Sequence, residues 1–87
     1  MREIILDFAK FEEKKDVFAE IGAGIALPEY FGGNLDALYD VLTEVDEDVK
    51  FYVFPAGKAF EEGFLQVLED SAEENGHIGV TITKLPG

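Results

Sequence analysis

Apolar residues along this chain follow two patterns: short runs typical of strands, and longer segments that repeat at helical spacing. The run IILDF at residues 4–8 is almost continuously apolar, which predicts a strand buried on both faces. The run KFYVF at 50–54 predicts a second strand, and alternating apolar residues at 78–83 predict a third. Apolar residues three and four positions apart predict three helices between the strands. These helices span residues 16–27, 35–44 and 58–74.

Two asparagine residues mark the ends of predicted helices. Asn34 precedes the second helix, and its side chain can accept from free N–H groups of the first turn, so we expect it to be the N-cap. Asn75 and Gly76 follow the third helix, where we expect a left-handed C-cap. The predicted buried faces are Val17, Phe18, Ile21 and Ile25 in the first helix, Leu35, Leu38, Val41 and Leu42 in the second, and Phe60, Phe64, Val67, Leu68 and either Ser71 or Ala72 in the third.

The order of predicted elements, β-α-α-β-α-β, indicates an α/β fold. Strands separated by helical crossovers form a parallel sheet, here of three strands packed with about three helices. No linker, repeat or low-complexity tract interrupts the chain, so we expect a single domain over residues 1–87. We expect the first strand in the middle of the sheet because it is the most uniformly apolar.

The charge of the chain restricts its partners. Seven Lys and Arg residues against nineteen Asp and Glu give a net charge of −12. This balance argues against binding to nucleic acid, whose phosphates require clustered Lys and Arg, and against anionic membranes. It favours a cationic partner or simple solubility. No apolar stretch approaches the ~20 residues of a transmembrane helix, and Asp7 interrupts the first apolar run too early for a signal peptide, so we expect a cytoplasmic protein.

Few residues in the sequence are suited to catalysis. The chain has no cysteine and one histidine, His77, which has no acidic or serine partner nearby in sequence and which we expect at the surface, where the last strand begins. The acidic run at 46–48 lacks the spacing of a calcium-binding loop, and the turn at 32–34 lacks a phosphate-binding motif. We therefore expect no enzymatic activity, no catalytic residue, no cofactor and no metal site.

Three acidic residues recur at intervals of four in the second predicted helix. Asp36, Asp40 and Glu44 therefore lie in line on one helix face. Like charges at this spacing destabilise a helix by a few tenths of a kcal/mol per pair, and no Lys or Arg lies between Asp16 and Lys50 to relieve them. Such a line is either a solvated acidic face or, beside aromatic residues 30 and 31, a surface that binds a cationic protein.

The residues around this line resemble a known family. Residues 27–42 have the sequence LPEYFGGNLDALYDVL, which is similar to the signature segment of the barstars. Barstars are small acidic intracellular inhibitors of barnase-type guanyl-specific ribonucleases. The resemblance extends more loosely over the whole chain, and the family fold is a three-stranded parallel sheet with helices. It implies that this protein is a ribonuclease inhibitor whose acidic helix and loop imitate the phosphates of RNA.

The resemblance also implies roles for individual residues. Family members block the ribonuclease active site with this loop and the start of the following helix. Asp40 matches the acid that enters the phosphate site, Asp36 matches a second acid that faces Arg or Lys, and Tyr30 matches an aromatic that packs on the nuclease. Glu44 completes the acidic line in the predicted partner-binding set. The remaining matching contacts are Gly32, Asn34, Leu35, Thr43 and Asp70.

Three features depart from the family pattern. Val45 stands where the best-studied member has tryptophan, and Glu44 adds a charge where a small residue is usual. The chain is also several residues shorter between Phe54 and Gln66, so a short helix of the family is expected to be lost or fused. The predicted partner is an extracellular barnase-type ribonuclease, bound one to one by a protein that is monomeric when free. The alternative is an acidic protein that binds another basic, nucleic-acid-binding partner.

Overall fold

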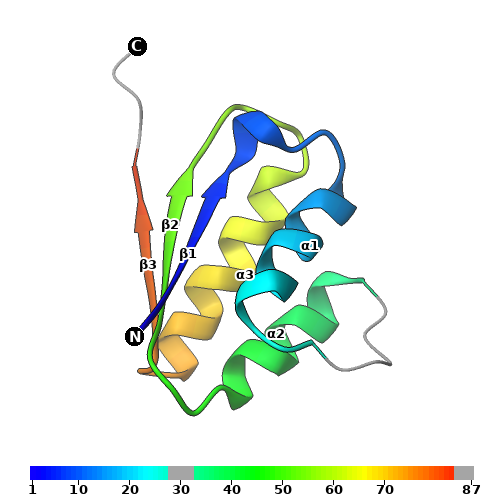
Figure 1. The fold of residues 1–87 in the computed structure, drawn as a ribbon. Helices are drawn as coiled ribbons and strands as arrows, with labels where there is room; N and C mark the ends of the chain where they lie inside the picture. The colour runs from blue at the N-terminus through cyan, green and yellow to red at the C-terminus, as the bar shows by residue number, and fades with distance from the viewer. Residues whose placement is uncertain (28–32, 84–87) are drawn as a thin grey trace.

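A computed structural model describes residues 1–27 and 33–83 of the chain, and its elements follow the predicted order (Figure 1). A short 3-10 helix, η1, follows the first strand and was not predicted. The elements are β1 (Arg2–Asp7), η1 (Phe8–Lys10), α1 (Lys14–Gly24), α2 (Leu35–Glu44), β2 (Val49–Phe54), α3 (Glu61–Glu74) and β3 (Ile78–Ile82). The order β-α-α-β-α-β and the α/β class are therefore confirmed.

The three strands form a parallel sheet in the order β1-β2-β3, so β2 is the central strand. The expectation that the first strand is central is wrong. All three helices cover the same face of the sheet, which leaves the other face open (Figure 1). On β1 the side chains of Ile4 and Leu6 are buried beneath the helices, whereas Ile5 points to the open face and is 57% exposed. A continuous apolar run therefore did not mean burial on both faces.

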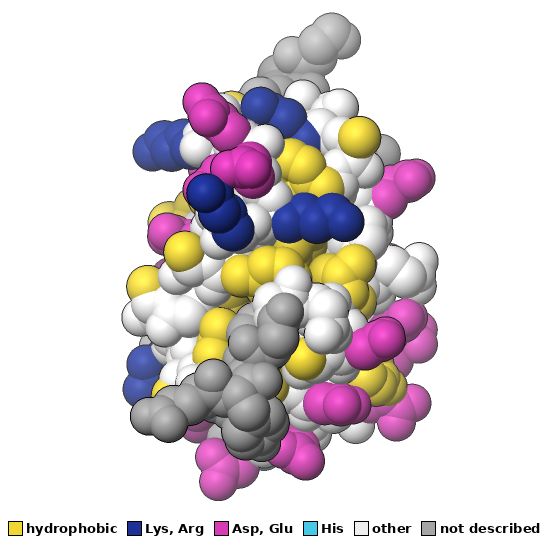
Figure 2. Space-filling view, turned by 90° about the vertical axis from the view of Figure 1, so that its right-hand side faces the viewer, with side chains coloured by type: hydrophobic (Ala, Val, Ile, Leu, Met, Phe, Trp, Pro, Cys, Tyr) yellow, Lys and Arg dark blue, Asp and Glu magenta, His cyan; other side chains and the backbone are white. Residues whose placement is uncertain are grey.

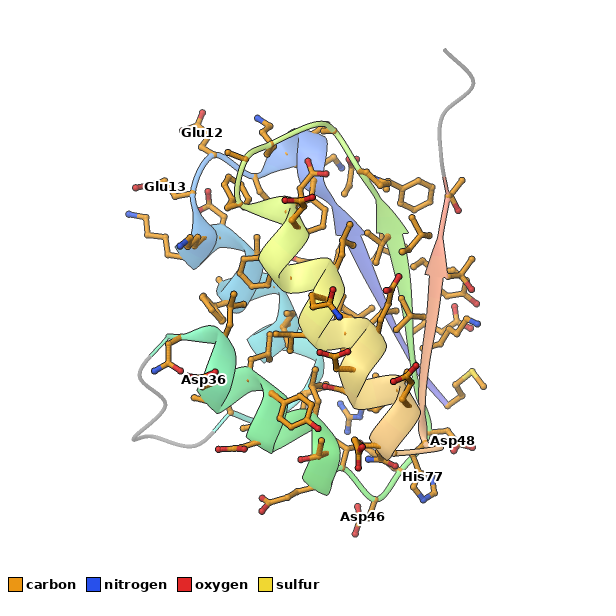
Figure 3. The ribbon with its side chains drawn as sticks, turned by 180° about the vertical axis from the view of Figure 1, so that it is seen from behind. Glu12, Glu13, Asp36, Asp46, Asp48 and His77 are labelled. Carbon is orange, nitrogen blue, oxygen red and sulfur yellow. The ribbon has the colours of Figure 1, made fainter. Side chains whose placement is uncertain are left out.

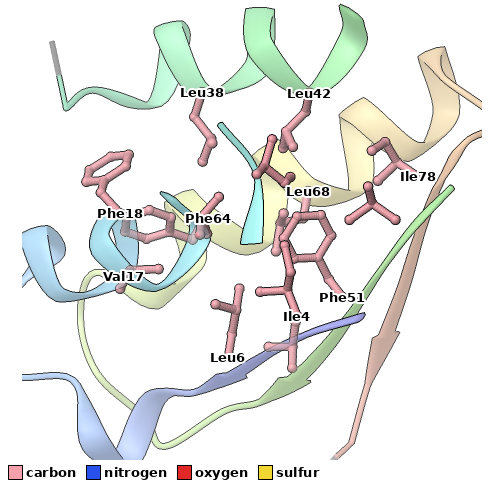
Figure 4. Packing of buried hydrophobic residues seen from close by; sticks show 14 of the residues in the cluster. Ile4, Leu6, Val17, Phe18, Leu38, Leu42, Phe51, Phe64, Leu68 and Ile78 are labelled. Atoms are coloured by element: carbon pink, nitrogen blue, oxygen red, sulfur yellow. The ribbon is translucent and has the colours of Figure 1, made fainter. Parts of the chain in front are cut away.

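The core lies between the sheet and the helices (Figure 4). Leu38 and Leu42 point from α2 into this core, and both are fully buried. The rings of Phe18 on α1 and Phe64 on α3 pack edge to face with their centroids 5.0 Å apart. The predicted face of α1 is thus confirmed, whereas of the predicted face of α2 Leu35 and Val41 are only half-buried against the core. In α3 the fully buried positions are Phe64, Leu68 and Ser71.

The connection between β2 and α3 is held by a buried carboxylate. The side chain of Glu61 is only 5% exposed, and its Oε2 accepts hydrogen bonds from the backbone N–H of Ala56 at 2.9 Å and of Lys58 at 2.7 Å. Helix α3 consequently begins at Glu61 and not near residue 58 as predicted. No helix forms between Phe54 and Glu61, in agreement with the predicted loss of a family helix.

Replacing Glu61 with alanine should lower the melting temperature markedly. The substitution leaves two backbone N–H groups without their acceptor, which costs about 1–3 kcal/mol and corresponds to roughly 5–20 °C in a domain of this size. A thermal melt followed by circular dichroism measures the change. Glu62→Ala is the matched control, because Glu62 is exposed on the same turn of α3. Equal melting temperatures for the two variants would show that Glu61 does not hold this connection.

The end of α3 differs from the prediction. Asn75 has an extended backbone with φ −131°, and the positive φ values among the described residues belong to Gly33 and Gly57. The predicted left-handed C-cap is therefore wrong. The Asn75 side chain turns towards α2 instead, where its Nδ2 donates to the carbonyl oxygens of Leu42 at 3.0 Å and Val45 at 2.8 Å. These bonds satisfy one carbonyl of α2 and the carbonyl of its C-cap, and they join that end of α2 to the segment between α3 and β3.

Candidate protein-binding surface

Helix α2 directs its three acidic side chains away from the core. Its N-cap is Asn34, as predicted, whose Oδ1 accepts a hydrogen bond from the backbone N–H of Ala37 at 2.7 Å. The buried Leu38 and Leu42 fix the rotation of the helix against the core. The opposite face consequently presents Asp36, Asp40 and Glu44, and all three side chains are exposed.

The carboxylates of Asp36, Asp40 and Glu44 make no hydrogen bond or ion pair with the part of the chain that the structure describes. Helix α2 carries three acidic residues and α3 carries six, and neither contains Lys or Arg. The bases Lys10, Lys14 and Lys15 belong to η1 and α1. Figure 2 shows this division, with most of the visible lysine and arginine side chains in the upper part of the view and most acidic side chains below and to the right. The molecule thus has a strongly negative side formed by α2 and α3.

Helix α3 packs directly against α2 and adds acids to the same side. The two helices approach closely at Gly63, where a Cβ atom would lie 2.6 Å from Cδ1 of Leu35. Near the other end of α2, the side chain of Asn75 joins the helices through its bonds to Leu42 and Val45. Asp70 of α3 is half-buried, and its Oδ1 accepts a hydrogen bond from Nε2 of Gln66 at 2.9 Å.

Tyr39 lies where the acids of α2 and α3 meet. Tyr39 as a whole residue is half-buried, and desolvation is the largest cause that raises its pKa above the ordinary value. The negative charges of Glu74, Asp70 and Asp40 raise it further. We term these four residues the Tyr39 cluster. Sequence reasoning did not single out Tyr39 or Glu74. The spacing of four between Asp70 and Glu74 indicates that both lie on one face of α3. The sequence does not show that this face packs beside α2.

Titration of Tyr39 should report the charge of this cluster. Its ring should ionise above the usual pH of about 10, because the neutral phenol is favoured in the folded state. The stability that this preference contributes is present below pH 10 and is lost as the pH rises towards the folded-state pKa. NMR titration of the ring measures the pKa. Asp70→Asn should lower the pKa of Tyr39, whereas Glu20→Gln on α1 should leave it unchanged. An equal pKa in both variants would show that the charge of Asp70 does not act on Tyr39.

The structure brings most of the predicted contact residues to the side formed by α2 and α3. Leu35 and Thr43 are half-buried on α2, and the hydroxyl of Thr43 donates to the backbone carbonyl of Asp40 at 3.0 Å. A hollow of about 240 Å³ lies beside the start of α2, lined by residues that include Asn34, Leu35 and Asp36. Tyr30 and Gly32 lie outside the described residues.

The single histidine is on the surface where β3 begins, as predicted. It has an acidic partner 29 positions away in the sequence, which was not predicted. Nδ1 of His77 lies 2.9 Å from Oδ1 of Asp48, which immediately precedes β2 (Figure 3). Parallel strands bring these two positions together. Both side chains are exposed. In Figure 3 this pair lies near the C-terminal end of α2, whereas Asp36 lies at the N-terminal end of that helix.

Within residues 1–27 and 33–83, no group of three or more His, Cys, Asp or Glu side chains is placed to hold a metal ion. Within the same ranges, no helix combines the length and the apolar content that crossing a membrane requires.

Comparison with known proteins identifies the family. Residues 1–84 match the family model described as "Barstar (barnase inhibitor)". The chain is also similar to a Bacillus subtilis (strain 168) protein named "Putative ribonuclease inhibitor YrdF", with 42% identity over 43 residues. That alignment covers 49% of this chain and 47% of the relative, so the chain matches about half of the relative's length. The family match covers almost the whole chain and agrees with the three-stranded parallel sheet. The protein therefore belongs to the barstar family.

Proposed function

We propose that this protein inhibits a barnase-type guanyl-specific ribonuclease by covering its active site with α2 and the preceding loop. The observation that carries the proposal is the row of exposed carboxylates on α2, which have no partner among the described residues, in a chain of the barstar family. A ribonuclease active site holds polyanionic RNA and is therefore cationic. Carboxylates that enter it replace the phosphates of RNA without offering a bond to cleave.

The residues have separate roles in this proposal. Asp40 enters the phosphate site, Asp36 pairs with a neighbouring Arg or Lys of the nuclease, and Tyr30 packs on a nuclease loop. Asp70 extends the contact from α3, which packs beside α2. Inhibition is steric and electrostatic, so no residue of this chain performs chemistry. The other proposed contacts are Gly32, Asn34, Leu35, Thr43 and Glu44.

The setting of this activity is part of the proposal. One domain formed by residues 1–87 would bind one molecule of a normally extracellular nuclease and would be monomeric when free. It would act in the cytoplasm, like an antitoxin, against nuclease that has not left the cell. The absence of cysteine suits a reducing compartment.

The deciding experiment is a titration of a purified barnase-type ribonuclease with this protein, using a fluorogenic RNA substrate. Activity should fall linearly to zero at one equivalent of inhibitor when the nuclease concentration is well above Kd. A ribonuclease of an unrelated fold is the control and should keep its activity. Full activity of the barnase-type enzyme at a large excess of this protein would contradict the proposal.

Two residues favour a second candidate, an acidic protein that binds a different basic, nucleic-acid-binding partner. Val45 is half-buried at the C-cap of α2, where the resemblance places a tryptophan, and Glu44 adds a charge beside it. A surface altered in this way fits a cationic partner other than a barnase-type enzyme. Lack of inhibition in the titration, together with complex formation with a basic RNA-binding protein in size-exclusion chromatography, would support this candidate.

A further inference from the structure

Asn75 makes an unusual set of contacts between α2 and the turn that follows α3. Its side chain is almost fully buried, and Nδ2 donates to the carbonyl oxygens of Leu42 at 3.0 Å and Val45 at 2.8 Å. The carbonyl of Thr43 lies within 3.5 Å of the same nitrogen. On the other side, Oδ1 accepts a hydrogen bond from the backbone N–H of His77 at 3.0 Å. One amide group therefore joins the end of α2 to the start of β3.

At the end of α2, the backbone N–H of Val45 donates to the carbonyl oxygen of Leu42 at 3.4 Å, a long bond that the Asn75 amide supplements. The last carbonyl groups of a helix have no partner within the helix, and they are commonly served by Lys, Arg or a glycine turn. The last turn of α2 contains no base, ends on Glu44 and continues into the extended Val45. The amide of Asn75 supplies hydrogen bonds to these carbonyls without bringing a positive charge to the acidic side of the molecule.

We infer that Asn75 is a positioning residue for the inhibitory surface, an inference that rests on the proposed function. The α2 carboxylates and the acids Asp70 and Glu74 reach one partner only if the two helices keep a fixed offset. Packing of Leu35 at Gly63 sets this offset near one end of α2, and Asn75 sets it at the other. Asn75 directly follows Glu74 in the chain. The bonds from Asn75 to the end of α2 therefore also fix the position of Glu74 relative to α2.

Asn75→Asp tests the inference, because the added charge and the lost contact with α2 should change the inhibition constant in opposite directions. The variant keeps Oδ1 as an acceptor for His77 but places an oxygen against the carbonyls of Leu42 and Val45. Added negative charge alone should strengthen binding to a cationic nuclease. Loss of the α2 contact should weaken it, and we expect the inhibition constant to rise about tenfold or more, mainly through faster dissociation. Asn75→Ala, which adds no charge, should also weaken inhibition.

A purely structural role must be separated from positioning. All constants are measured at a temperature where every variant is folded, as shown by its thermal melt. The control is Val53→Ala in the buried centre of β2, which should lower the melting temperature yet leave the inhibition constant within about twofold. Amide hydrogen exchange supplies a second readout: Asn75→Asp should accelerate exchange in the last turn of α2 and not in α1.

The outcomes distinguish this inference from the proposed function. If the unmodified protein inhibits and folded Asn75→Asp inhibits equally well, Asn75 does not position the surface. Weakening of the same size in Val53→Ala would also overturn the inference. If the unmodified protein fails to inhibit, the proposed function fails, and with it the claim that Asn75 serves inhibition. Hydrogen exchange then still decides whether Asn75 fixes the end of α2.

Discussion

Replacing Asp40 with alanine should weaken inhibition of a barnase-type ribonuclease at least ~30-fold without lowering the stability of the free protein. The two effects have different origins. In the complex, the cationic site of the nuclease would remain buried without the charge that balances it. Removing one partner of such a pair costs about 2–5 kcal/mol in general, which is roughly 30-fold to several thousand-fold in affinity.

The free protein should tolerate the same change. The Asp40 carboxylate is exposed and makes no hydrogen bond or ion pair with residues of the described ranges. Asp36 and Glu44 lie one turn away on either side, so the substitution removes two repulsions and introduces a better helix former. Each term amounts to a few tenths of a kcal/mol. We therefore expect the melting temperature to stay level or to rise by a few degrees.

Thermal melts and inhibition assays on the same preparations measure both effects. Glu20→Ala is the matched control, because it removes one exposed acid from α1, away from the proposed contact surface. It should change inhibition only slightly. A marked fall in the melting temperature of Asp40→Ala with unchanged inhibition would show that Asp40 is structural and not the central inhibitory residue.

The local features of this fold were largely predictable from sequence. The bounds of α2 agree with the predicted residues 35–44, because Asn34 marks its start and the apolar spacing defines one face. At α1 the prediction was less accurate. The helix begins at Lys14 because Glu13 and Asp16 form a capping box, and it ends at Gly24, whose carbonyl accepts from Nη1 of Arg2 at 2.7 Å. The contact with Arg2 joins residues 22 positions apart and has no local signal.

Features that depend on contacts between distant residues were less predictable. The central strand was assigned by hydrophobicity, yet Ile5 of β1 faces solvent because every helix covers the same face of the sheet. The acids of α2 were visible as a repeat within one helix. Tyr39 and Glu74 gain their significance only when α2 and α3 pack together, as does the bond from Asn75 to Val45. Periodicity reveals a face of a helix but not its neighbour.

Association with a cationic nuclease should depend strongly on salt. The acids of α2 and α3 form a one-signed surface, and the total charge is −12. At an ionic strength of about 0.01 M charges act over roughly 30 Å, against roughly 8 Å at 0.15 M. The association rate constant should therefore fall at least about tenfold over this range, while the dissociation rate constant changes much less.

Stopped-flow fluorescence at several salt concentrations measures the association rate constant. Two charge-matched triple variants show which acidic residues accelerate association. Each variant replaces three exposed glutamates with glutamine and so removes the same total charge. The first variant changes Glu44, Glu73 and Glu74, and the second changes Glu3, Glu12 and Glu20. The first should flatten the salt dependence more than the second, because its charges lie on the side that meets the partner. Equal slopes would mean that only net charge matters, and an association rate constant independent of salt would eliminate steering by α2 and α3.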